Sequence, residues 1–198
     1  MKPLPLRLVA ASSRLSARWF GLALLPILAA GCVSTFHEVK PLTAARPPAE
    51  RPAALVLGHV EFADARLTAT EKELYQLKFR QGVEAWFAKT NVFDSIITGT
   101  NVPLRSVVLT GTISEVEKGS AAARFWVGMG AGQARVQGEF ELKDPAEQIV
   151  ARFTARRSYL GGSGIGGGDM LGMDELTFRL GQTVAETVYK WSQGKKLE

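Results

Sequence analysis

The clearest pattern in the sequence is a strict alternation of apolar and polar residues between positions 135 and 143. The apolar or small members are Val136, Gly138, Phe140 and Leu142, and the polar members are Arg135, Gln137, Glu139, Glu141 and Lys143. Successive side chains of a β-strand point to opposite faces of a sheet, so this segment predicts a strand with one dry and one wet face. A sheet of that kind has to be covered by a second layer.

A partner strand is expected directly after this segment. Asp144-Pro145 is typical of a turn. Beyond it the apolar face continues through Ile149, Ala151, Phe153 and Ala155, opposed by Arg152, Thr154 and Arg156. The two segments therefore predict an antiparallel hairpin.

Three further strands are expected upstream. Residues 55–62 are rich in branched and aromatic side chains and predict a mostly buried strand. Residues 92–97 predict a short strand. Residues 107–116 form the longest β-type run and predict a central strand, with Val107, Leu109, Gly111 and Ile113 on one side.

Two helices are expected to cover the sheet. Thr70-Glu71-Lys72-Glu73 has the form of a capping box, and a helix from there to about Lys89 places Tyr75, Phe79, Val83 and Trp86 on one face. A second helix carries Leu176, Leu180, Val184, Val188 and Trp191, with Asp174 at its start and Gly194 after its end. The prediction is a two-layer α+β sandwich over residues 53–198, with a mainly antiparallel sheet of four to five strands and both helices on one face.

The N-terminal region has the layout of a secretory signal peptide over residues 1–31. Lys2, Arg7, Arg14 and Arg18 precede an apolar run over 19–30, which is too short for the roughly 20 residues of a membrane-spanning helix. Leu28, Ala29, Ala30 and Gly31 then lead into Cys32, the single cysteine of the chain.

Residues 28–32 resemble the box that precedes the acylated cysteine of bacterial lipoproteins. We therefore expect Cys32 to carry lipid and to attach the protein to a membrane. Val33 and Ser34 follow the cysteine where aspartate favours inner-membrane retention in such proteins, so the resemblance implies an outer-membrane anchor with the domain facing the periplasm. The alternative is an ordinary secreted protein that is cleaved nearby.

The proline-rich segment over residues 32–52 is expected to be a tether between the lipid and the folded domain. It contains Pro41, Pro47, Pro48 and Pro52. Proline-rich segments stay extended, and about 20 residues at about 3.1 Å each would reach roughly 60 Å.

Charge argues against nucleic acid as a partner. The chain has 24 basic and 19 acidic residues, and the leader holds four of the basic ones, so the remainder is close to neutral. Nucleic-acid-binding domains carry clustered positive charge, which the mixed pattern here lacks.

A glycine-rich segment between the central strand and the hairpin is the candidate interaction loop. Its residues are Arg124, Phe125, Trp126, Gly128, Met129, Gly130 and Gly132. Nucleotide-binding loops of this kind open a helix, whereas a strand is expected to follow here. The alternatives that remain are packing within the hairpin, or contact of the apolar tip with a partner or a membrane.

Two other segments each have a structural interpretation and a functional one. Residues 161–168 are nearly all glycine and predict a flexible linker, or else a loop that orders against another subunit. Arg152, Arg156 and Arg157 predict a solvated strand face with cross-strand partners in Glu139 and Glu141, or else a site for an anionic headgroup or glycan.

The sequence contains few residues in arrangements suited to catalysis or metal binding. His37 lies in the expected tether and His59 in an expected strand, so the histidines are not spaced as metal ligands, and the lone thiol is assigned to lipid. We expect no enzymatic activity, metal or cofactor.

The combination of these motifs resembles a known family. The lipobox, residues 108–115, the Arg-Phe-Trp-Val-Gly-Met-Gly-Ala-Gly stretch within 122–132 and the following amphipathic strand are similar to bacterial lipoproteins of domain of unknown function family 4410. The resemblance covers roughly residues 55–191 and implies a location and a fold. A binding or assembly module with an envelope partner or self-association is the first hypothesis. A carrier or enzyme for lipid or peptidoglycan, and a purely structural protein, are the alternatives.

Overall fold

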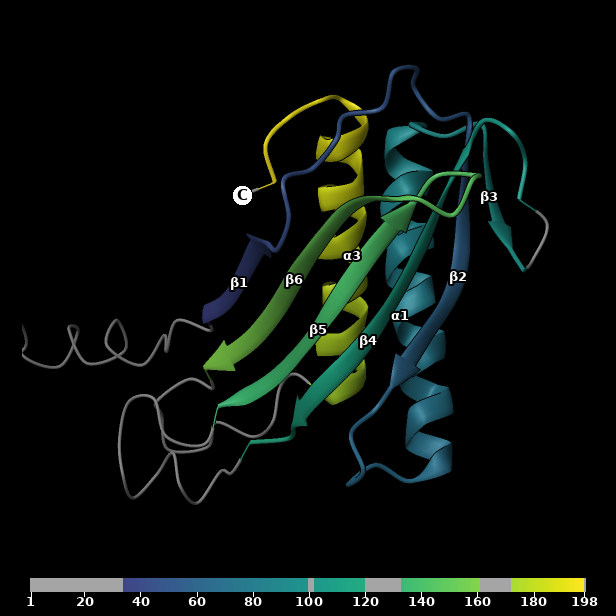
Figure 1. Ribbon diagram of the computed structural model, residues 1–198. Helices are drawn as coiled ribbons and strands as arrows, with labels where there is room; N and C mark the ends of the chain where they lie inside the picture. The colour runs from purple at the N-terminus through teal and green to yellow at the C-terminus, as the bar shows by residue number, and fades with distance from the viewer. Residues whose placement is uncertain (1–33, 100–101, 120–132, 161–171, 198) are drawn as a thin grey trace, which may run out of the picture. The chain divides into compact units, whose positions relative to one another are not determined.

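A six-stranded open sheet with two long helices on one face is formed by the residues that the computed structural model describes, which are 34–99, 102–119, 133–160 and 172–197 (Figure 1). These residues belong to one unit, 33–198. The order of strands across the sheet is β1-β6-β5-β4-β2-β3. The elements are β1 (Ser34–Pro41), β2 (Ala54–Phe62), α1 (Ala69–Thr90), β3 (Ser95–Thr98), β4 (Ser106–Glu117), β5 (Ala134–Lys143), β6 (Ile149–Leu160) and α3 (Met173–Ser192).

The predicted hairpin is confirmed as β5 and β6. The two strands pair antiparallel, and Val136, Phe140 and Leu142 are fully buried on the face toward the helices. Asp144 closes the turn, because its Oδ1 accepts hydrogen bonds from the backbone of Ala146 and Gln148, each at 2.9 Å.

The predicted α+β class is confirmed, and the sheet is mixed. Neighbouring strands are antiparallel from β1 through β6 and β5 to β4. β2 is parallel to both β3 and β4, because α1 carries the chain back across the sheet between β2 and β3.

The sixth strand comes from the segment that the sequence assigned to a tether. Residues 34–41 form edge strand β1, which pairs with β6 over its whole length. The chain stays attached afterwards, since Arg46 donates its backbone N–H to Val150 and its carbonyl accepts the indole N–H of Trp191 at 2.8 Å. The described part of the expected tether, residues 34–52, is therefore attached to the sheet and not extended away from it. Pro41 ends the strand instead of interrupting it, and an edge strand tolerates proline at that place.

The first helix begins two residues earlier than predicted. Thr68 is the N-cap, and its side chain accepts the backbone N–H of Glu71 while the Glu71 carboxylate accepts the backbone N–H of Thr68. The capping box is thus Thr68 to Glu71 and not Thr70 to Glu73. Asn91 ends the helix in the left-handed conformation.

The second helix follows the prediction closely. It begins after Gly172, which supplies no side-chain cap, with Asp174 in its first turn, and Gly194 follows its end with φ of 67°. All five predicted apolar positions are buried.

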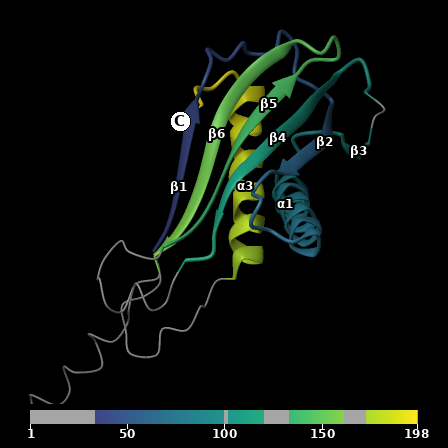
Figure 2. The same cartoon turned by 60° about the horizontal axis from the view of Figure 1, so that its bottom comes forward.

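The core lies between the sheet and the two helices, which run side by side over one face (Figure 2). Phe79 of α1 stacks on Phe140 of β5 at 5.5 Å, and Phe140 stacks on Phe153 of β6 at 5.8 Å. The other face of the sheet carries no helix among the described residues.

Candidate functional site

The residues predicted to carry function lie outside the described part of the chain. These are Cys32 with the preceding positions Leu28, Ala29, Ala30 and Gly31, the candidate interaction loop over 124–132, and the glycine segment over 161–168. The structure does describe the residues that flank them.

The flanking residues meet at one end of the sheet, which we call the Ser34 end. β1 starts there at Ser34, opposite Leu160 at the end of β6. β5 starts there at Ala134, opposite Tyr159, and β4 ends there at Glu117, opposite Arg135. β2 runs toward the same end: Phe62 pairs with Ile113, and the side chain of Asp64 accepts the backbone N–H of Val116, next to the end of β4. The chain thus enters from Cys32, and leaves toward both glycine-rich segments, at the same end.

The open face of the sheet is a solvated surface of paired charges. Arg152 of β6 forms ion pairs with Glu141 and, at 3.5 Å, with Glu139, both on β5. These are the cross-strand carboxylates that the sequence predicted. Arg156 instead pairs with Glu38 of β1. This partner was not predicted, because Glu38 was expected to lie in a tether.

Arg157 lies apart from the other two arginines, on the face toward α3. Its Nε donates a hydrogen bond to Thr183 Oγ1 at 2.6 Å. Partial burial lowers the pKa of Arg157, with a further contribution from the positive charge of Arg179. The three arginines therefore do not form a single anion site.

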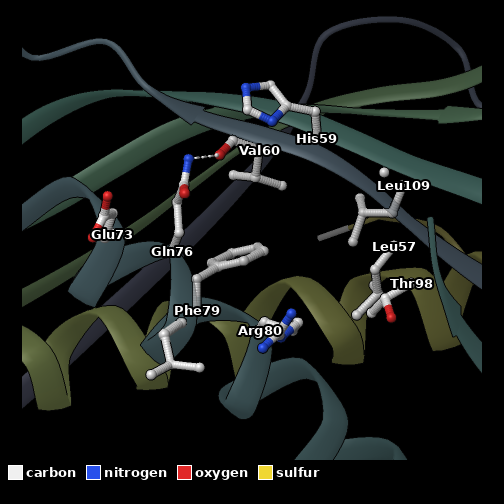
Figure 3. A pocket seen from close by; sticks show the side chains of 11 residues that line it. Leu57, His59, Val60, Glu73, Gln76, Phe79, Arg80, Thr98 and Leu109 are labelled. Carbon is white, nitrogen blue, oxygen red and sulfur yellow. Dashed lines mark hydrogen bonds between the residues drawn. The ribbon is translucent and has the colours of Figure 1, made fainter. Parts of the chain in front are cut away.

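A hollow of about 380 Å³ lies between β2 and α1, and we call it the β2–α1 hollow (Figure 3). Its volume falls at the lower end of the range of small-molecule sites. It is lined by Leu57, Gly58, His59, Val60, Glu73, Gln76, Leu77, Phe79, Arg80, Thr98 and Leu109.

The polar groups of this hollow do not converge on one point. Gln76 donates its side-chain amide to the Val60 carbonyl at 3.2 Å, so that group is already used. The His59 ring lies on the opposite side of β2 from the Phe79 ring (Figure 3). Arg80 is 3.7 Å from Glu84, one turn along α1. Nucleophilic or acid-base catalysis needs side chains within hydrogen-bond reach of one another, and these lining residues lack that arrangement.

A second hollow, of about 510 Å³, lies where the chain passes from β1 over the end of α3. It is lined largely by Pro41, Leu42, Ala45, Pro47 and Trp191, together with Lys195 and Lys196. No local sequence pattern indicates either hollow, because each is lined by segments that are distant in the chain.

Two carboxylates at the Ser34 end have strongly lowered pKa values. Hydrogen bonds from Arg66 hold the pKa of the buried Asp64 carboxyl well below its usual range, and the backbone N–H of Val116 also donates to it. Lys118, assisted by Thr68, lowers the pKa of Glu71 to about 2. These contacts fasten the start of α1 to the end of β4.

Within the described ranges, no three His, Cys, Asp or Glu side chains gather closely enough to hold a metal ion. Within the same ranges, neither helix has the length and hydropathy needed to span a bilayer.

The resemblance to the lipoprotein family is confirmed over part of its expected length. Residues 66–163 match the profile of the family described as Domain of unknown function (DUF4410). No curated protein sequence matches the chain.

Several solved structures resemble the chain at low sequence identity. A PelC dodecamer from Paraburkholderia phytofirmans is 15% identical, with 81% of this chain and 99% of that chain covered and a TM-score of 0.47. A point variant of the same dodecamer is 16% identical, covers 75% and 94%, and has a TM-score of 0.48. A minor lipoprotein from Acinetobacter baumannii is 13% identical, covers 69% and 92%, and has a TM-score of 0.37.

Proposed function

We propose, starting from the match of residues 66–163 to the DUF4410 family, that this protein is a lipoprotein of the bacterial cell envelope, anchored by acyl chains on Cys32. The observation that carries the proposal is the cationic and apolar leader ending in Leu28, Ala29, Ala30 and Gly31 before a single cysteine. Acyl chains contribute about 0.8 kcal/mol per buried methylene, so two or more would hold the domain at a membrane. Val33 and Ser34 favour the outer membrane, with the domain in the periplasm.

We further propose that the domain is a binding or assembly module without catalysis. The polar residues that line the β2–α1 hollow are dispersed, and the described residues gather no metal ligands. We expect Phe125, Trp126 and Met129 of the candidate interaction loop, whose described flanks lie at the Ser34 end, to contact an envelope partner or a second copy of the chain.

Lipidation is tested by metabolic labelling. Cells that express the full chain should incorporate radioactive palmitate into it, and Cys32→Ser should abolish the label and release the protein from membranes. Ser34→Ala is the matched control, because it alters a neighbouring small side chain and leaves the thiol in place. Equal labelling of Cys32→Ser and the wild type would contradict an anchor at this residue.

The binding role is tested by cross-linking in intact cells followed by mass spectrometry. Trp126→Ser combined with Met129→Ser should lower the recovered partner or oligomer at least threefold and leave the unfolding temperature unchanged. Leu104→Ser removes another large apolar side chain, 91% exposed, from the opposite end of the sheet and should have no effect. Unchanged cross-linking in the double variant would count against the loop as the contact.

The alternative function is a carrier or enzyme for a small lipid- or peptidoglycan-derived ligand. The β2–α1 hollow is the feature that favours it, since its volume of about 380 Å³ suits such a ligand. A rise in unfolding temperature on addition of soluble peptidoglycan fragments or short-chain phospholipid would support this alternative.

A further inference from the structure

We infer that the Ser34 end of the sheet lies against the lipid surface, held there directly and without a flexible tether. This inference rests on the proposed acylation of Cys32. It adds an orientation of the domain, which lipidation alone does not specify.

Covalent geometry keeps Cys32 close to the first residue of β1. Cys32 and Ser34 are separated by two peptide units, and an extended chain spans at most about 3.6 Å per residue, so their Cα atoms lie within about 7 Å of each other. A tether to residue 52 would instead allow roughly 60 Å.

Strand pairing fixes Ser34 on the folded domain. β1 is paired with β6 from Ser34 opposite Leu160 to Pro41 opposite Phe153. The backbone of Leu42 continues the attachment by donating to the carbonyl of Arg152 at 2.8 Å. An anchor on Cys32 therefore pulls on the sheet itself.

The same end carries side chains that suit a bilayer surface. Phe36 is 52% exposed on the face of β1 away from the helices, only four residues after Cys32. Arg66 and Lys118 keep 66% and 58% of their side chains exposed at this end, although each is also paired with a carboxylate. Aromatic and basic side chains of this kind are favoured at lipid interfaces.

The opposite end of the domain is too far away to reach the same surface when the sheet stands on its Ser34 end. β5 has 10 residues, which at about 3.4 Å each span about 30 Å between the two ends. The turn after β5 and the loop before β4, including Leu104, lie at that opposite end.

Two pairs of variants of the full chain, each with one added cysteine, test this orientation. The wild type has one cysteine, so after acylation an engineered cysteine is the only free thiol. Ala65→Cys places a label in the exposed turn at the Ser34 end, where the neighbouring Asp64 contacts Val116. Ala146→Cys places the same label in the exposed β5–β6 turn at the opposite end. Ala63→Cys and Leu104→Cys are a second pair with the same logic.

Each labelled protein is reconstituted in vesicles of phosphatidylethanolamine and phosphatidylglycerol that contain a lipid-borne quencher of the attached fluorophore. We expect quenching at residue 65 to exceed quenching at residue 146 at least threefold, with the same order for residues 63 and 104. Equal or reversed quenching in both pairs overturns the inference.

Flotation of the same vesicles separates this inference from the proposed function. Protein that floats with the vesicles and shows equal quenching retains its lipid anchor, so the orientation alone is wrong. Protein that does not float lacks the anchor, and both proposals are then wrong. Melting curves that match the wild type establish that the variants are folded.

Discussion

The carboxylate of Asp64 is buried where the chain leaves β2, and it joins three separate backbone and side-chain groups. Arg66 donates to it from its backbone and from its guanidinium at 2.7 to 2.9 Å, and the backbone of Val116 donates at 3.2 Å. Hydrogen bonds to a charged group contribute more than neutral ones, and the loss of one partner leaves buried donors without acceptors.

Asp64→Asn should therefore lower the free energy of unfolding by about 2 kcal/mol at neutral pH. Because folding lowers the pKa of Asp64 from its ordinary 3.8, its contribution is present above that pH and is lost as the pH falls through the folded-state pKa. The difference between wild type and variant should thus narrow below about pH 4.

Urea denaturation at a series of pH values measures this difference. Glu73→Gln is the control, since Glu73 is exposed on α1 and its substitution should change stability by less than about 0.5 kcal/mol. A gap between wild type and Asp64→Asn that stays constant down to pH 2 would contradict the role given to the ionised carboxylate.

The two helices approach each other through glycine at their crossing. A Cβ atom added at Gly82 would lie 2.0 Å from the Phe178 carbonyl oxygen, and one added at Gly181 would lie 2.2 Å from the Phe79 carbonyl oxygen. Both obstacles are backbone atoms, so the helices would have to move apart.

Gly82→Ala should accordingly destabilise the protein by about 2 kcal/mol or more, through overpacking. Helix propensity alone predicts the opposite sign, since alanine in a helix interior is favoured over glycine by about 1 kcal/mol. Thermal or denaturant unfolding decides between the two signs, and Gln81→Ala at the exposed neighbouring position should be close to neutral.

Elements with strong local patterns were predictable from the sequence, and those with weak ones were not. The alternation around Phe140 and the spacing of Leu176, Leu180 and Val184 predicted β5 and α3 because one face of each had to be buried. β1 was missed because the prolines at and after its end and its position after the leader suggested a tether. Its place in the sheet depends on pairing with β6, which no local pattern reveals.

At the scale of the whole molecule, the sequence predicted the layers but not the site. The β2–α1 hollow arises where α1 passes over β2, so it depends on the packing of two elements and not on a motif. The convergence of the β1 start, the β6 end and the flanks of the candidate interaction loop at one end likewise follows from strand order. Residue spacing alone contains no information on that order.

The pairing of β1 with β6 has a consequence for the order of events during export. If Cys32 is acylated as the chain crosses the inner membrane, Ser34 emerges early and its partner Leu160 emerges much later. Contacts between residues so far apart form slowly, because a long loop must close first. The acylating enzymes would therefore meet an unfolded chain, and the sheet would close its edge only after the lipid is in place.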